Sequence, residues 1–178
     1  MKTILALSLL AAPAFADCPA GTDYSSKIAT VVERMQTAPH EGAARVLSAQ
    51  MWDIWLDAPD ELDQAMLDAG MASIQMGDRM VATSHLDELV AYCPDYAEGY
   101  NQRAFASFLQ GKYDDALVDL DAAIALQPVH LGALTGKALT LIELGRADDA
   151  QDVLRTALAI NPWLAERALL NEPQGEDI

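Results

Sequence analysis

The chain has 178 residues, 27 of them acidic and 11 basic, so its formal net charge at pH 7 is −16. The few basic residues are spread along the chain, whereas a nucleic-acid-binding protein clusters Lys and Arg to neutralise phosphates. The sequence therefore argues against nucleic acid as a partner. It is long enough for one domain with a continuous core, and its acidity is typical of a solvated surface.

The chain begins with the features of a cleavable export signal. Lys2 precedes an apolar run that ends near Ala12, and residues 14–16 (Ala-Phe-Ala) have the small-x-small pattern of a signal-peptidase site. We expect residues 1–16 to be removed after Ala16 and the protein to be exported to the periplasm of a Gram-negative bacterium, although secretion beyond the envelope gives the same pattern. The run is far shorter than the roughly 20 residues that span a bilayer, so we expect no stable membrane insertion afterwards.

The two cysteines of the chain are Cys18 and Cys93. In an oxidising compartment they allow one intramolecular pairing, so we expect a disulfide that ties the N-terminal arm to the first repeat described below. One alternative is a pair of free thiols, with Cys93 buried as a small apolar side chain. Lipidation of Cys18 is disfavoured, because residues 15–17 lack the Leu-small-small sequence of a lipoprotein signal.

Residues 17–62 are predicted to form an N-terminal arm and a capping helix pair. The two helices are expected over Tyr24–Gln36 and Glu41–Leu56, divided by the Ala-Pro-His sequence at residues 38–40. Three apolar side chains of the second helix are available to cover the repeat that follows: Met51, Ile54 and Trp55. Such atypical end elements are what a stacked helical array needs.

A period of 34 residues runs through the next part of the chain. Three residue types recur at this spacing: Pro94, Pro128 and Pro162; Gly77, Gly111 and Gly145; Ala82, Ala116 and Ala150. The period predicts three repeats over residues 63–96, 97–130 and 131–164, each made of two helices. The prolines end the second helices, the glycines suit a left-handed residue that closes the first helices, and the alanines suit a close approach of paired helices.

The second repeat is predicted to have helices over Ala97–Gln110 and Tyr113–Leu126. It resembles the tetratricopeptide repeat family, whose unit is a 34-residue helix-turn-helix. The matching residues are Ala97, Glu98, Gly99, Tyr100, Asn101, Ala104, Gly111, Tyr113, Ala116, Ala123 and Pro128. Arg103 and Lys137 stand where the family usually has leucine, so we expect looser packing there or side chains that extend outward.

The resemblance implies an all-α, right-handed solenoid. Three helix pairs of the tetratricopeptide type are flanked by the N-terminal pair and by a short C-terminal helix, expected over Trp163–Leu170. Residues 165–178 would then form the C-terminal cap and a solvated tail.

Nothing in the sequence predicts catalysis, a metal or a cofactor. The chain has no Gly-x-Ser-x-Gly elbow, no Ser-x-x-Lys pair and no glycine-rich phosphate loop. His40-Glu41 begins like a zinc-protease motif, but Ala44 stands where the second histidine belongs. We expect a protein that is not an enzyme. The alternative from another class is an enzyme with a pocket formed by Trp52, Trp55 and His40 in the N-terminal pair.

The resemblance further implies that the first helices of the repeats line a concave side. The expected partner-binding residues on it are Leu67, Met71, Asn101, Phe105, Phe108, Leu109, Thr135 and Leu139. Most are apolar, so we expect a protein or peptide with an apolar segment, anchored on Phe105 and Phe108 while Asn101 bonds its backbone. Family members that grip a terminal carboxylate use lysine, arginine and asparagine. Of these, only Asn101 fits, which disfavours an acidic C-terminal peptide.

The expected function is an exported, non-catalytic scaffold for protein–protein interaction. Two alternatives stay open. The same apolar residues are core if the N-terminal pair or the terminal helix covers them. Alternatively, the chain is a self-associating structural or assembly factor of the envelope that uses the concave side or the capping helices.

Overall fold

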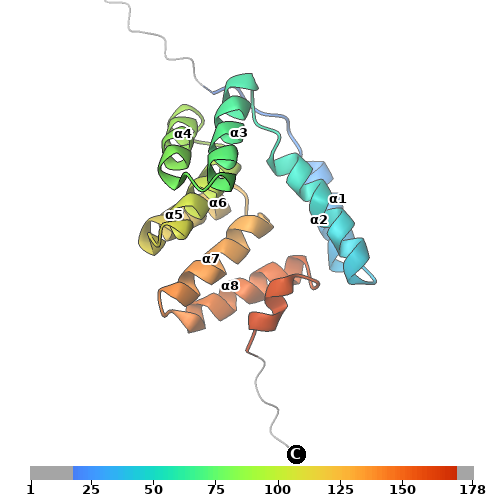
Figure 1. Cartoon of the computed structure of the whole chain (residues 1–178). Helices are drawn as coiled ribbons and strands as arrows, with labels where there is room; N and C mark the ends of the chain where they lie inside the picture. The colour runs from blue at the N-terminus through green and yellow to red at the C-terminus, as the bar shows by residue number, and fades with distance from the viewer. Residues whose placement is uncertain (1–17, 172–178) are drawn as a thin grey trace, which may run out of the picture.

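The computed structural model describes residues 18–171, and all the regular structure in this range is helical (Figure 1). The elements are α1 Ser25–Gln36, α2 Glu41–Trp55, α3 Glu61–Gln75, α4 Arg79–Tyr92, α5 Ala97–Leu109, α6 Tyr113–Leu126, α7 Leu131–Glu143, α8 Ala147–Ile160 and the 3-10 helix η1 Ala165–Leu169. None of the helices so described combines the length and apolar character that a membrane span requires. The expected signal peptide and residues 172–178 lie outside the described residues.

Three helix pairs, α3–α4, α5–α6 and α7–α8, stack in chain order into a curved solenoid (Figure 1). The turn inside each pair has the same geometry, because Gly77, Gly111 and Gly145 have φ angles of 81°, 72° and 72°. A side chain on Cβ is strained in this left-handed region, which explains why glycine recurs there. The predicted left-handed closure is confirmed at all three positions.

The alanines of the period lie buried within the helix pairs. Ala82, Ala116 and Ala150 each have no exposed surface. Ala116 packs in one cluster with Ala104 of α5 and Leu120 of α6, so a methyl group fills the space available between these helices. The burial of the three alanines agrees with the prediction of small residues between paired helices, and their place at the closest approach stays a prediction.

The two basic residues at leucine positions form ion pairs between helices. The Arg103 guanidinium donates hydrogen bonds of 2.8 and 2.7 Å to the two carboxylate oxygens of Asp119 in α6, and one of 2.9 Å to Asp87 in α4. Lys137 pairs with Asp121 of α6 at 2.5 Å. Each basic residue thus reaches the second helix of the preceding repeat, and the contact is repeated along the array.

The expectation that the N-terminal pair covers the first repeat is wrong. Met51, Ile54 and Trp55 pack instead into a cluster with residues of the third repeat. The partners from that repeat are Leu131, Leu134, Ala157 and Ile160. The α1–α2 pair therefore folds back along the solenoid, and α1 packs against α8 (Figure 1).

The α1–α2 pair contacts the segments at which the repeats end. At one end, Trp55 accepts a 2.6 Å hydrogen bond on its carbonyl oxygen from the Tyr96 hydroxyl, and its indole stacks on the His130 ring at 4.1 Å. At the other end, the Trp163 Nε1–H donates to the carbonyl oxygen of Ala38 at 2.9 Å. Tyr96 and His130 stand at equivalent repeat positions, 34 residues apart. The helix pair thus braces the turn that follows each of the three repeats.

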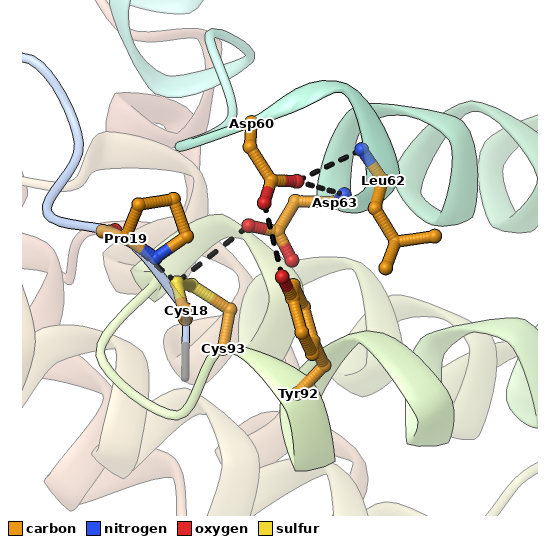
Figure 2. The surroundings of a disulfide bond; sticks show 7 residues. All are labelled: Cys18, Pro19, Asp60, Leu62, Asp63, Tyr92 and Cys93. Carbon is orange, nitrogen blue, oxygen red and sulfur yellow. Dashed lines mark hydrogen bonds between the residues drawn. A yellow bond between two sulfur atoms is a disulfide. The ribbon is translucent and has the colours of Figure 1, made fainter. Parts of the chain in front are cut away.

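A disulfide joins Cys18 to Cys93, with the two Cα atoms 4.9 Å apart, as predicted. It fixes the N-terminal arm to the end of α4, beside the first turn of α3 (Figure 2). Asp60 caps α3 by accepting hydrogen bonds of 2.8 Å from the backbone N–H groups of Leu62 and Asp63. The Asp63 carboxylate lies against the disulfide, with Oδ2 3.6 Å from Sγ of Cys18.

The C-terminal element is shorter and tighter than predicted. We expected a helix over Trp163–Leu170, and the structure has a 3-10 helix over Ala165–Leu169. It is held by side chains, because Gln151 of α8 donates to the carbonyl oxygen of Leu169 at 3.1 Å and accepts from the backbone of Asn171 at 2.7 Å. Such bonds replace the intrahelical pattern that a single short turn cannot complete.

Candidate partner-binding groove

A groove of about 400 Å³ lies on the side of the solenoid formed by the first helices α3, α5 and α7. Its walls are mostly apolar, and within residues 18–171 no Asp, Glu, Lys, Arg, His or Cys side chain lines it. The volume is within the range of ordinary ligand sites, which are concave and apolar with a few polar groups. The groove is therefore suited to recognition by shape and burial.

Six of the eight predicted partner-binding residues line this groove: Met71, Asn101, Phe105, Phe108, Thr135 and Leu139. The other two do not. Leu67 has no exposed surface and belongs to the core cluster of the first repeat. Leu109 is partly buried at the end of α5 and lies outside the groove lining.

The groove is open in the described part of the chain. Phe105 is 48% exposed and Leu139 is 36% exposed, although both are large apolar side chains. The Phe108 ring is held edge-on against Tyr113, with the ring centres 5.3 Å apart. Of the α1–α2 pair, only Trp52 contributes to the lining, so this pair leaves most of the groove uncovered.

Trp52 closes one end of the groove, a role that no sequence pattern indicated. Its ring is edge-on to Trp55 and His130, with centre distances of 5.3 and 6.0 Å. Gly132 lies directly beneath it, since a Cβ at this position would come within 2.7 Å of Cη2 of Trp52. The absence of a side chain at Gly132 therefore allows the tryptophan to reach the groove.

A buried polar network lies behind the groove wall. Glu98, in the first turn of α5, is 1% exposed, and its carboxylate accepts hydrogen bonds from Asn101 Nδ2 at 3.1 Å and Gln102 Nε2 at 2.5 Å. A third bond of 2.8 Å joins it to Nε2 of His130, which has no exposed surface. His130 also caps α7, because its Nδ1 accepts the N–H of Ala133 at 3.1 Å.

Sequence reasoning identified Asn101 but missed Glu98, Gln102 and His130. A signal was present in the repeat alignment, because Glu98 stands where the other repeats have Gln64 and Gly132. A carboxylate on the inward face of a first helix needs a partner when it is buried. That partner, His130, is 32 residues away, and only the packing of α7 on α5 brings it close.

The alternative pocket of Trp52, Trp55 and His40 is not formed. His40 is exposed and caps the start of α2 by accepting the N–H of Ala43 at 3.1 Å, whereas both tryptophans lie at the opposite end of this helix. Trp55 is buried in the core. Elsewhere in residues 18–171, Cys18, Cys93 and Asp63 come together with the spacing of metal ligands, but both sulfurs are in the disulfide and so are not thiolate ligands.

Comparison with known sequences identifies the repeats. A family model described as tetratricopeptide repeat matches residues 107–169. A TPR repeat-containing protein of Rhizobium etli is 32% identical over 91 residues, which are 51% of this chain and 45% of that protein. Human tetratricopeptide repeat protein 36 is 29% identical over 126 residues, covering 68% of this chain and 67% of that protein. The chain thus spans less than half the length of the Rhizobium relative.

Solved structures share the same fold. The first TPR of Spaghetti (RPAP3), bound to the HSP90 peptide SRMEEVD, superposes with a TM-score of 0.58 at 19% identity and covers 60% of this chain and 84% of that one. MamA gives a TM-score of 0.55 at 21% identity, with 74% of each chain covered. These likenesses support the fold, and the three 34-residue repeats place the family residues in one register. Residues 107–169 thus match the tetratricopeptide repeat family, and the described chain has the fold of tetratricopeptide repeat solenoids.

Proposed function

We propose that this chain is an exported, periplasmic scaffold without catalytic activity, which binds a protein or peptide through an apolar segment held in the groove. The fold is one that serves protein–protein interaction, and the groove is the site on it best suited to that task. The observation that carries the proposal is the exposure of Phe105, a large apolar side chain left 48% accessible within a hollow of about 400 Å³. Exposed apolar surface in a concave site is the usual mark of a partner site.

The solved neighbours support a peptide ligand but not the same peptide. Those neighbours are TPR domains described as bound to HSP90 or HSP70 peptides, such as SRMEEVD and SGPTIEEVD, which end in acidic residues and a carboxylate. A groove that binds such a terminus needs positive charge, and no Lys or Arg of the described chain lines this one. A segment held by apolar burial fits the lining better.

A site-specific crosslinker tests whether the groove binds. A photoreactive phenylalanine analogue placed at Phe105 should crosslink a partner protein in cells, and the adduct can be identified by mass spectrometry. The matched control is the same analogue at Val118 of α6, which is 69% exposed but lies outside the groove lining. Partner adducts at position 105 alone support the proposal. Equal adducts at both positions, or none at 105, would contradict it, and a dimer adduct would favour self-association.

Export is tested at the N-terminus. In fractionated cells, the protein should be recovered from the periplasm and should begin at Asp17. Ala16→Pro should block cleavage and leave the uncut chain in the membrane fraction, because proline next to the cleaved bond prevents its recognition. A cytoplasmic wild-type chain that keeps residues 1–16 would sink the export part of the proposal and leave the groove untouched.

A further inference from the structure

We propose that the groove recognises a basic group, the ammonium of lysine or the guanidinium of arginine, carried by the apolar segment that it binds. This inference rests on the proposed function and names the chemistry of the partner. It follows from the Glu98 network, which lies directly behind Asn101 and Gln102 in the groove wall.

His130 contacts the Glu98 carboxylate through Nε2 of its ring. Nδ1 of His130 accepts the N–H of Ala133, so the single ring proton is on Nε2, which faces the Glu98 carboxylate. A second proton on the ring would place two N–H groups against each other at Ala133. In this arrangement Nε2–H of His130 donates a hydrogen bond to the Glu98 carboxylate.

Glu98 is not paired with a lysine or arginine side chain in the described part of the chain. Within residues 18–171, no Lys or Arg forms a salt bridge with Glu98. The nearby Arg103 is occupied by Asp119 and Asp87. The other neighbours of His130 are the aromatic rings of Trp52 and Trp55. Behind the wall of the groove, the Glu98 carboxylate thus has hydrogen bonds from Asn101, Gln102 and His130 but no Lys or Arg partner among the described residues.

The hydrogen bonds to Glu98 fix the orientation of the two amides in the groove wall. A carboxylate only accepts hydrogen bonds, so Asn101 and Gln102 both turn their NH₂ groups toward Glu98. This orientation leaves Oδ1 of Asn101 and Oε1 of Gln102 as the ends available to a ligand. No hydrogen bond to either oxygen is formed by the described residues. Asn101 and Gln102 therefore offer acceptors, and no donor, to a ligand in the groove.

The ligand must match this arrangement. Two carbonyl oxygens in front of a buried carboxylate favour a group that donates hydrogen bonds and is positively charged. The rings of Trp52, Phe105 and Phe108 in the lining also attract cations through their faces. A terminal carboxylate placed against Asn101 and Gln102 would meet two acceptor oxygens and no donor from those two side chains. The net charge of −16 adds a long-range attraction for basic partners.

A displayed library of random twelve-residue peptides tests the inference, because it offers basic, acidic and apolar segments to the groove at the same time. Binders selected on residues 17–178 and lost on Phe105→Ala define the groove-dependent set. We expect this set to be enriched at least threefold in Lys and Arg over the starting library. The enrichment should persist on Glu88→Gln, which removes an exposed acid of α4, and should disappear on Glu98→Gln.

The Glu88→Gln control separates site recognition from general attraction to an acidic protein, because both variants change the net charge by one unit. A selected peptide is then synthesised with its Lys replaced by norleucine, which keeps the apolar chain and removes the ammonium. On the wild type, titration should show roughly tenfold weaker binding of the norleucine peptide, the size of one charge-assisted hydrogen bond.

A second variant covers the case in which Glu98→Gln does not fold. Gln102→Met keeps the length of a half-buried side chain and removes its carbonyl, so it should weaken the Lys peptide several-fold and leave the norleucine peptide unchanged. Groove-dependent binders without basic enrichment would overturn this inference and keep the groove. A library with no binder that depends on Phe105 would overturn both the inference and the proposed function.

Discussion

The carboxyl group of Asp63 is buried without a full set of hydrogen bonds. The residue has no exposed surface, and its Oδ1 has no hydrogen-bond partner among the described residues. Burial, together with the nearby charge of Asp60, raises the pKa of Asp63 to about 6. The sulfur of Cys18 lies on its other side and cannot compensate a negative charge (Figure 2).

This pKa predicts a specific pH dependence of stability. The folded state keeps the Asp63 proton up to a pH of about 6, whereas the unfolded chain releases it near its ordinary value of 3.8. The folded state therefore binds more protons between these values, and stability falls as the pH rises from 4 to 6. Above that range the ionised group costs up to about 3 kcal/mol, at about 1.4 kcal/mol per pKa unit.

Asp63→Asn should remove this cost. Urea unfolding at pH 7.5 should show a gain of about 1 to 2 kcal/mol over the wild type, less than the full amount because the amide is also buried without partners. The gain should vanish at pH 4. Asp68→Asn, an exposed change on the same helix, should alter neither value. A variant no more stable than wild type at pH 7.5 would mean that Asp63 is solvated.

Arg103 and Lys137 occupy the same repeat position, but they face acids of different burial. Asp119, the partner of Arg103, has a side chain 8% exposed, whereas Asp121, the partner of Lys137, is 54% exposed. Arg103→Leu should cost about 2 to 4 kcal/mol, because it leaves a buried carboxylate unpaired. Lys137→Leu should cost less than about 1 kcal/mol.

The double variant Arg103→Leu with Asp119→Leu completes the test. It removes both charges, so thermal and urea unfolding should recover most of the stability lost in Arg103→Leu. If the loss of unfolding free energy in the double variant equals the sum of the losses in the two single variants, Asp119 and Arg103 contribute to stability independently. Both basic residues stood out in the sequence as departures from the family, yet the sequence could not tell them apart, because the burial of the acid is a property of helix packing.

At the scale of elements, we expect the packing of α5 against α6 to require a side chain as small as that of Ala116. Ala116→Leu adds volume to a site with no exposed surface and should cost about 1 to 3 kcal/mol by overpacking. For a chain of this size, that lowers the thermal midpoint by about 2 to 4 °C per kcal/mol. Calorimetry checks the shift, with Ala125→Leu on the exposed side of α6 as the control. Equal melting curves would show that the crossing tolerates larger residues.

The elements within the repeats were predictable because the same local chemistry recurs three times. Gly111 requires a left-handed turn, Pro128 follows the end of α6, and α6 spans the residues predicted for it. The groove residues Phe105 and Phe108 followed from the register of α5. The same register predicted Leu67 in the groove, and this prediction was wrong. The Leu67 side chain has no exposed surface and packs in the core of the first repeat.

At the scale of the whole molecule, the disulfide and the α1–α2 pair join regions far apart in sequence. Cys18→Ser with Cys93→Ser opens a loop of 75 residues and should cost about 2 to 4 kcal/mol, the typical contribution of a disulfide, against an upper expectation of about 4.5 kcal/mol from the chain-entropy model. The thermal midpoint of the wild type should fall on reduction, and that of the double variant should not respond to reductant. A wild-type midpoint unchanged by reductant would remove the disulfide as a source of stability.

The placement of the α1–α2 pair could not be predicted from sequence. Its apolar residues Met51, Ile54 and Trp55 are compatible with any apolar partner, and proximity along the chain suggested the first repeat. The outcome depends on Tyr96 and His130, which present a hydroxyl and a ring to Trp55 at successive turns. These two residues look unrelated in the sequence until their common repeat position is compared.

The brace formed by α1 and α2 affects how the groove responds to a partner. In a solenoid held only by contacts between neighbouring repeats, the curvature can change when a ligand draws the repeats together. Here the α1–α2 pair and its connecting turn contact Tyr96, His130 and Trp163. These three contacts restrain the angle between successive repeats. We expect the groove to keep its width whether it is empty or filled. Partner binding would then cost little conformational entropy of the protein. The partner would be selected by the fit of its shape to a preformed groove.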